Sequence, residues 1–317
     1  FMSQSYVRVG SASPETAEVP QDELDGFEKP VRDLLEPGSE EFLQREIIDI
    51  EMVDNWEQLR GRESMHLSDS KLIGLPHKII ESSVQRLMCD QNLIQELPAS
   101  FGQMPAIRQL HLQHNSIVHL PESFGQMKTL ENLRLDHNKL RELPDSFGSL
   151  SSLEWLELQE NHLRELPESF VNLNKMARCM LHENRLASLP ESFNKLESLQ
   201  VLRLECNLIA KLPPSFGELP SLRFANLEHN RLTELPEGFG KLASLDSLLL
   251  GGNCIMSLPK SFEQLKSLKS FELGPINRFR VEFPRISSAL GLNGCSACAR
   301  RRASSARDIG MKIGTLS

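Results

Sequence analysis

Two histidines that stand 23 residues apart, His114 and His137, are the first side chains in this sequence that could do chemistry together. Imidazole nitrogens and carboxylate oxygens are common zinc ligands, and Asp136 and Glu160 supply carboxylates close by in the sequence. If 23 residues make one turn of a coiled chain with a strand in every turn, the two imidazoles lie about 5 Å apart, close enough to share a metal ion. Polar side chains are also expected in any exposed column of such a coil, so the sequence alone leads us to predict neither metal ligands nor a cofactor.

Short motifs near the C-terminus could bind or be modified. Arg280, Val281 and Phe283 form an R-V-x-F segment, the docking pattern of regulatory subunits of the type-one protein phosphatase, in which an extended segment adds to a sheet edge. Val281 also stands where the local pattern requires an apolar core residue, and we prefer that structural interpretation. Ser304 follows three arginines and resembles a basophilic kinase site, where a phosphate would weaken the positive charge of the tail.

No sequence pattern predicts catalysis. A phosphate-cradling G-x-x-x-x-G-K-[ST] loop, a nucleophile elbow and a metal-binding H-E-x-x-H helix are all missing from the sequence. A lone C-x-x-C pair, Cys295 and Cys298, has neither a second pair nor a histidine cluster after it. We therefore expect a protein that is not an enzyme.

The elements that carry these residues come from an internal repeat. The pattern L-P-x-S-F-G-x-L-x-x-L-x-x-L-x-L-x-x-N-x-L returns every 23 residues in eight uninterrupted copies over 97–280. A 22-residue copy precedes them at 75–96, and a weaker one at 53–74 has Ser70 in place of the asparagine. No single coil can bury its own apolar face, so the copies must stack on one another.

Each column of the repeat has a predictable environment. Leucines at alternate positions, such as Leu133 and Leu135, indicate the inward face of a short strand. The phenylalanine column from Phe101 to Phe262 predicts a second apolar spine on the opposite side. An asparagine column from Asn92 to Asn253 predicts buried amides that pair with the backbones of neighbouring coils.

The repeat resembles the leucine-rich repeat family, in its intracellular 23-residue class, over about residues 53–280. Within that class it is similar to Ras-pathway leucine-rich scaffolds, Ras-suppressor proteins and plant intracellular Ras-group-related repeat proteins. The resemblance implies an α/β fold, a right-handed solenoid with a concave parallel β-sheet and short helical or 3-10 convex segments. It also implies a non-catalytic scaffold or adaptor in signal transduction, with a small GTPase as one possible partner.

The outward positions of the predicted strands are where function is expected, because the frame constrains every other column. An apolar group near the middle of the array lies among charged side chains, as in protein-binding hot spots. Its predicted protein-binding residues are Arg134, Trp155, Glu157, Arg178, Met180, Val201, Arg203 and Phe224. Along one edge, six carboxylates form either a surface for basic groups of a partner or an ordinary solvated rim: Asp136, Glu157, Glu160, Glu183, Glu205 and Glu228.

Two alternatives to a scaffold stay open. The chain could be a regulatory subunit that recruits the phosphatase through its R-V-x-F segment. It could also be the recognition half of a larger enzyme, such as an effector ubiquitin ligase or a receptor-like kinase.

Charge and composition complete the prediction. The chain has 43 acidic and 35 basic side chains, a formal charge of -8, with an acidic excess in the first 60 residues and a basic excess after residue 277. The balanced middle disfavours nucleic-acid binding, and the basic tail could touch an acidic membrane surface. No apolar run is long enough to span a bilayer, no secretory signal is recognisable, and the six cysteines form no disulfide framework. We expect a cytoplasmic monomer with a disordered arm at 1–28, a helical cap at 29–52, about ten coils at 53–280 and a degenerate coil and basic tail at 281–317.

Overall fold

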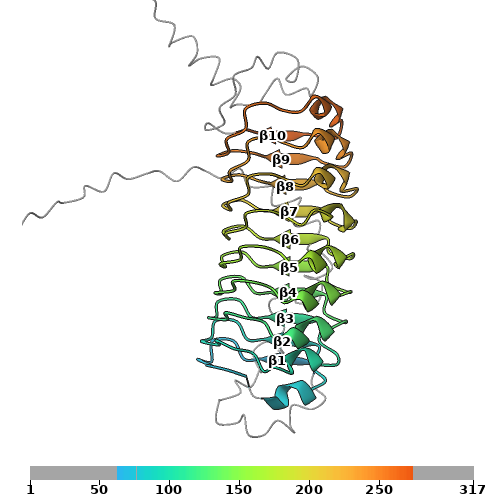
Figure 1. Ribbon diagram of the computed structural model, residues 1–317. Helices are drawn as coiled ribbons and strands as arrows, with labels where there is room; N and C mark the ends of the chain where they lie inside the picture. The colour runs from blue at the N-terminus through green and yellow to red at the C-terminus, as the bar shows by residue number, and fades with distance from the viewer. Residues whose placement is uncertain (1–62, 76, 274–317) are drawn as a thin grey trace, which may run out of the picture. The chain divides into compact units, whose positions relative to one another are not determined.

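The computed structural model describes residues 63–75 and 77–273, which form ten successive coils with one short strand in each (Figure 1). The chain divides into two units, residues 1–47 and 48–317, and all the described residues belong to the second. The strands follow one another in chain order in a parallel sheet of ten strands. They are β1 (Ser64–His66), β2 (Arg86–Met88), β3 (Gln109–His111), β4 (Asn132–Arg134), β5 (Trp155–Glu157), β6 (Arg178–Met180), β7 (Val201–Arg203), β8 (Phe224–Asn226), β9 (Ser247–Leu249) and β10 (Ser270–Glu272).

The register of the sheet follows the repeat length. Leu133 of β4 lies opposite Leu156 of β5, and Cys179 of β6 follows in the same row. Because the side chains of a strand alternate between two faces, the middle residue of every strand points inward and is buried, whereas the first and third residues point outward. We call these outward side chains of β1–β10 the sheet face.

Short 3-10 helices follow one another along the other side of the stack (Figure 1). Their phenylalanines, Phe101 to Phe262, have no exposed surface. Six neighbouring pairs stack with ring centroids 5.9–6.4 Å apart, which confirms the predicted spine. The helices are η3 (His77–Glu81), η4 (Phe101–Gln103), η5 (Glu122–Gln126), η6 (Asp145–Ser149), η7 (Glu168–Asn172), η8 (Phe193–Lys195), η9 (Pro214–Glu218), η10 (Glu237–Lys241) and η11 (Lys260–Gln264).

The repeated proline and glycine have separate local roles. In η5, Pro121 precedes the helix with φ -69°, and its carbonyl accepts a hydrogen bond from the Phe124 amide, as the fixed φ of proline favours. Gly125 follows the buried ring, where a Cβ would lie 1.9 Å from the Ser146 carbonyl oxygen. Glycine is thus required there because adjacent coils approach too closely for any side chain.

The asparagine column joins each coil to its neighbours as predicted. Asn138 is 5% exposed, and its Nδ2 donates to the carbonyl of Leu112 in the preceding coil and to that of Leu135 in its own. Its Oδ1 accepts from the Ile117 amide at 2.9 Å. Equivalent bonds recur along the column, so backbone groups that lie away from water are paired.

Several sequence predictions fall outside the described residues. These are the N-terminal arm and cap, the R-V-x-F segment at 280–283, the C-x-x-C pair, and Ser304 in the basic tail. Cys89 and Cys179 are buried free thiols, and Cys206 and Cys254 are exposed free thiols. No helix within 63–75 and 77–273 is long and apolar enough to cross a membrane.

Candidate functional site

The eight side chains predicted to bind a partner all project from the sheet face of strands β4 to β8. One row of the register runs through Trp155, Arg178, Val201 and Phe224. The next row runs through Arg134, Glu157, Met180 and Arg203. The repeat frame therefore brings the whole predicted set onto five adjacent strands.

Trp155 is held between two guanidinium groups. The Cζ atom of Arg178 lies 4.8 Å from the ring centroid, and that of Arg134 lies 5.3 Å from it. Both distances are within the range of cation–π attraction. Nε of Arg134 is also 3.7 Å from the Glu157 carboxylate, which fixes this guanidinium from its other side. Charge on neighbouring strands thus orients an aromatic ring that a partner can contact.

Val201 and Phe224 continue this row away from the tryptophan, and Met180 lies in the adjacent row. All three side chains are half-buried. Packing against neighbouring strands covers their flanks, which leaves an apolar strip bordered by polar groups. Such a strip beside an aromatic anchor has the composition of an interface core.

Arg203, one of the predicted protein-binding residues, forms an ion pair within its own coil. Its Nε donates to Oε1 of Glu205 at 2.7 Å, and its second guanidinium nitrogen contacts the same oxygen. Glu205 is only 8% exposed, so this carboxylate is more buried than a solvated rim would be. The pair neutralises itself within one coil, and Arg134 and Arg178 remain the guanidinium groups directed at the aromatic anchor.

The acidic edge, defined by the six carboxylates of the predicted rim, is likewise only partly a solvent-facing surface. Asp136 is 6% exposed, whereas the Glu160 side chain is 42% exposed. Burial raises the pKa of Glu157; Arg134 opposes this shift and Asp136 adds to it. Burial also raises the pKa of Glu228, and the nearby Glu272 carboxylate adds to that shift. The ionised forms of these two carboxylates are therefore disfavoured, and a nearby cation or basic group would stabilise them.

Buried side-chain atoms that make no hydrogen bond gather on the same side of the coils. Ten such side-chain atoms occur among the described residues, and all but two, the hydroxyls of Ser146 and Ser169, lie on the sheet face or two residues after a strand. An unpaired buried group costs about 1–3 kcal/mol, so the fold tolerates a local energetic cost on this side of the coils. The eight atoms are Gln113 Oε1, Asn132 Oδ1, Arg134 Nε, Asp136 Oδ1, Trp155 Nε1, Gln159 Oε1, His182 Nδ1 and Glu205 Oε2.

Two histidines of this surface were not singled out by sequence reasoning. Burial and the charge of Arg134 together lower the pKa of His111 to about 4, against the opposing Asp90 and Asp136 carboxylates. Burial likewise lowers the pKa of His182 to about 4, assisted by Arg203 and His137. The repeat predicts the column in which each histidine lies. It does not predict which neighbouring side chains bury the ring.

Comparison with known proteins agrees with this geometry. One family model, described as a leucine-rich repeat region, matches residues 132–211, and two leucine-rich repeat models match residues 82–140 and 221–242. No curated protein matches the sequence significantly.

Three of the solved structures that match the chain come from different kinds of protein. The leucine-rich repeat domain of the type III effector XCV3220 (XopL) is 22% identical with a TM-score of 0.58, over 83% of this chain and 85% of that one. The Arabidopsis receptor kinase HAESA, solved with the peptide hormone IDA and the co-receptor SERK1, is 25% identical with a TM-score of 0.60. That match covers 69% of this chain but only 39% of HAESA. The Leptospira interrogans protein LIC12759 is 25% identical with a TM-score of 0.42, over 74% of this chain and 83% of that one.

The coil-by-coil register, the buried asparagine column and the matching repeat models lead to one assignment. The chain is a leucine-rich repeat protein.

Proposed function

We propose that the chain is a non-catalytic interaction domain that binds a protein partner on the sheet face of β4–β8. The observation that carries this proposal is the half-buried Trp155 ring, held between Arg134 and Arg178 with its Nε1 donor unpaired. Aromatic and arginine side chains dominate protein-binding hot spots. Stacked repeats create extended surfaces suited to such contacts.

The chemistry of the surface indicates the kind of partner. A segment with apolar side chains fits the strip formed by Met180, Val201 and Phe224. Basic groups beside that segment fit the acidic edge. The plant receptor HAESA, which has the same repeat architecture, was solved with a peptide hormone, which supports a polypeptide ligand here.

A role as an intracellular signalling scaffold extends this proposal. The free cysteines at positions 89, 179, 206 and 254 support a reducing compartment.

The test is affinity capture from cells of the source organism, followed by calorimetry with each captured protein after purification. We expect Trp155→Ala to weaken the specific complex by about 30-fold, as for a hot-spot residue worth about 2 kcal/mol. The matched control is Met256→Ala, which truncates an apolar side chain that is 60% exposed and lies outside the strands. Equal affinity of the wild type and Trp155→Ala for every purified partner would refute binding on this face.

A further inference from the structure

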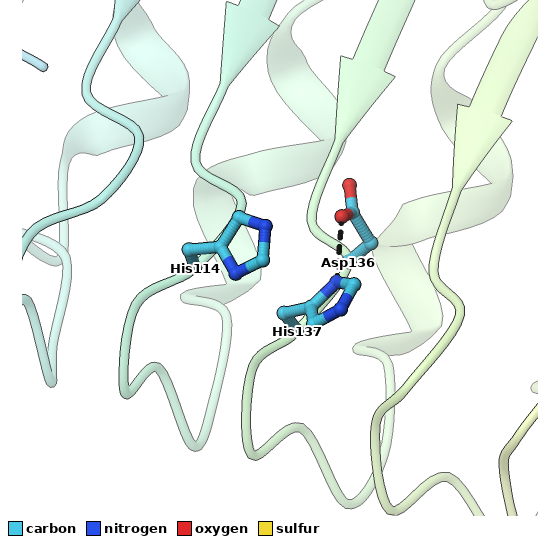
Figure 2. A group of neighbouring side chains, drawn as sticks. All are labelled: His114, Asp136 and His137. Atoms are coloured by element: carbon cyan, nitrogen blue, oxygen red, sulfur yellow. Dashed lines mark hydrogen bonds and ion pairs between the residues drawn. The ribbon is translucent and has the colours of Figure 1, made fainter.

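A cluster of metal-ligating side chains lies just beyond the ends of β3 and β4. Figure 2 shows the imidazoles of His114 and His137 side by side on adjacent coils, with the Asp136 carboxylate beside the His137 ring. One ligand atom from each of the three residues lies within 4.8 Å of the other two. Among the described residues, no other group of at least three histidine, cysteine, aspartate or glutamate side chains has this geometry.

The backbone fixes where both imidazoles begin. His114 and His137 occupy equivalent positions with φ of 54° and 53°, in the left-handed region. The His114 amide donates to the Asp136 carbonyl at 3.0 Å, and the His137 amide donates to the Gln159 carbonyl at 3.1 Å. Each histidine also precedes a buried asparagine of the column. The ring centroids are only 4.0 Å apart, so the frame places the two donors side by side.

The donor atoms are already oriented by carboxylates. Nδ1 of His137 lies 2.9 Å from Oδ2 of Asp136, and its Nε2 lies 2.8 Å from Oε1 of Glu160. Metal-bound histidines usually donate their second ring N–H to a carboxylate, which fixes the tautomer. Glu160 is placed to accept from Nε2, which leaves Nδ1 to face Asp136. Oδ1 of Asp136 is buried and accepts no hydrogen bond.

We propose that His114, Asp136 and His137 bind a divalent transition-metal ion of the zinc class. A ring nitrogen of His114, Nδ1 of His137 and the Asp136 carboxylate would be the ligands, and water would complete the coordination. The ion would occupy the space between His137 Nδ1 and Asp136 Oδ2, and any proton held there would be released to solvent.

The geometry and the donor types both favour this class of ion. Zinc bonds of about 2.0–2.2 Å separate neighbouring ligand atoms by about 3.3 Å, close to the Nδ1–Oδ2 distance, and the exposed His114 ring can rotate to close the third side. Two imidazole nitrogens disfavour calcium and magnesium, which prefer oxygen ligands. Glu160 contacts His137, and both Asp136 and Glu160 belong to the acidic edge. A bound cation would therefore offset part of the negative charge of that edge.

Calorimetric titration of the full chain with Zn²⁺ tests the proposal. The titration uses a Cys295→Ser/Cys298→Ser background, because that C-x-x-C pair could bind zinc independently. We expect one ion per chain at protein concentrations of about 10 µM. Glutamine occupies the histidine column at Gln91, with φ 56°, so His114→Gln and His137→Gln should preserve the backbone. Each should weaken zinc binding by at least about tenfold, as should Asp136→Asn, and Glu160→Gln by about tenfold through the second ring nitrogen.

The matched control is His229→Gln, a substitution in the same column, with φ 51°, at a coil without a neighbouring histidine. This variant should bind zinc like the wild type. Absence of stoichiometric binding, or binding that His114→Gln and His137→Gln leave unchanged, overturns the proposal. Circular dichroism of each variant verifies that the fold is intact, and the readout is independent of any protein partner.

Discussion

The His182 ring, two residues after β6, makes the stability of the fold depend on pH. Burial lowers its pKa to about 4, whereas in the unfolded chain the pKa is about 6.5. As pH falls from 6.5 to 4, the unfolded chain takes up a proton that the folded ring still refuses, so this residue lowers the free energy of unfolding. Above pH 6.5 both states are neutral at this position and the effect vanishes.

His182→Gln should therefore lessen the loss of stability between pH 7 and pH 4.5 by about 1–2 kcal/mol, a value reduced for the partial exposure of the ring. Glutamine is native at the equivalent positions Gln113 and Gln159, which makes the substitution compatible with the column. Urea denaturation at the two pH values measures the difference. His119→Gln, at a side chain that is 63% exposed, serves as the control. Parallel pH profiles for wild type and His182→Gln would contradict the assignment.

Residue identity and residue environment differ in how far they can be predicted. The 23-residue repeat predicts that Trp155, Arg178 and Phe224 lie on one face of the sheet. The repeat length sets the register between strands, and the two-residue period of a strand sets which way each side chain points. The repeat pattern does not predict that Arg203 pairs with Glu205 in its own coil. Two charged side chains on one coil can point toward each other or toward a binding partner. Rotamers and burial decide that choice, and neither follows from spacing.

At the scale of the element, each coil depends on its asparagine. Asn161 is 3% exposed; its Nδ2 donates to the Leu135 and Leu158 carbonyls, and its Oδ1 accepts from the Leu140 amide. Asn161→Ala leaves these buried backbone groups unpaired, and we expect it to lower the free energy of unfolding by about 2–4 kcal/mol.

Chemical denaturation of Asn161→Ala and of Asn174→Ala provides the comparison, since Asn174 is an exposed asparagine outside the buried column. The control should change stability by no more than about 0.5 kcal/mol. A similar small effect at both positions would mean that water or backbone shifts replace the amide at Asn161.

The coils could be predicted because the leucine, phenylalanine, glycine and asparagine positions of the repeat all favour the same structure. Leucine spacing gives the strand, the phenylalanine and glycine give the turn, and the asparagine gives the link between coils. Ser70 marks the place where this agreement weakens. There the Asn92 side chain of the next coil accepts from the Ser70 and Leu72 amides, so the following coil supplies the amide that links the two.

At the scale of the whole described array, each coil should be stabilised mainly by the coils next to it. Each strand pairs only with the strands before and after it, and each column asparagine bonds within its own coil and to the preceding one. Such an array behaves as a row of units coupled to their nearest neighbours. A defect in the middle should therefore open the coils beside it before the distant ones.

Hydrogen exchange measured by mass spectrometry can detect this pattern in Asn161→Ala. Peptides covering β4, β5 and β6 should lose protection by about 10-fold or more, as a local loss of about 1.4 kcal/mol requires. Peptides covering β9 and β10, four and five coils away, should keep their wild-type protection, because no bond of Asn161 reaches them. An equal loss of protection from β1 to β10 would instead show that the array opens as one cooperative unit. In that case a partner on the sheet face would stabilise every coil at once rather than the five strands it contacts.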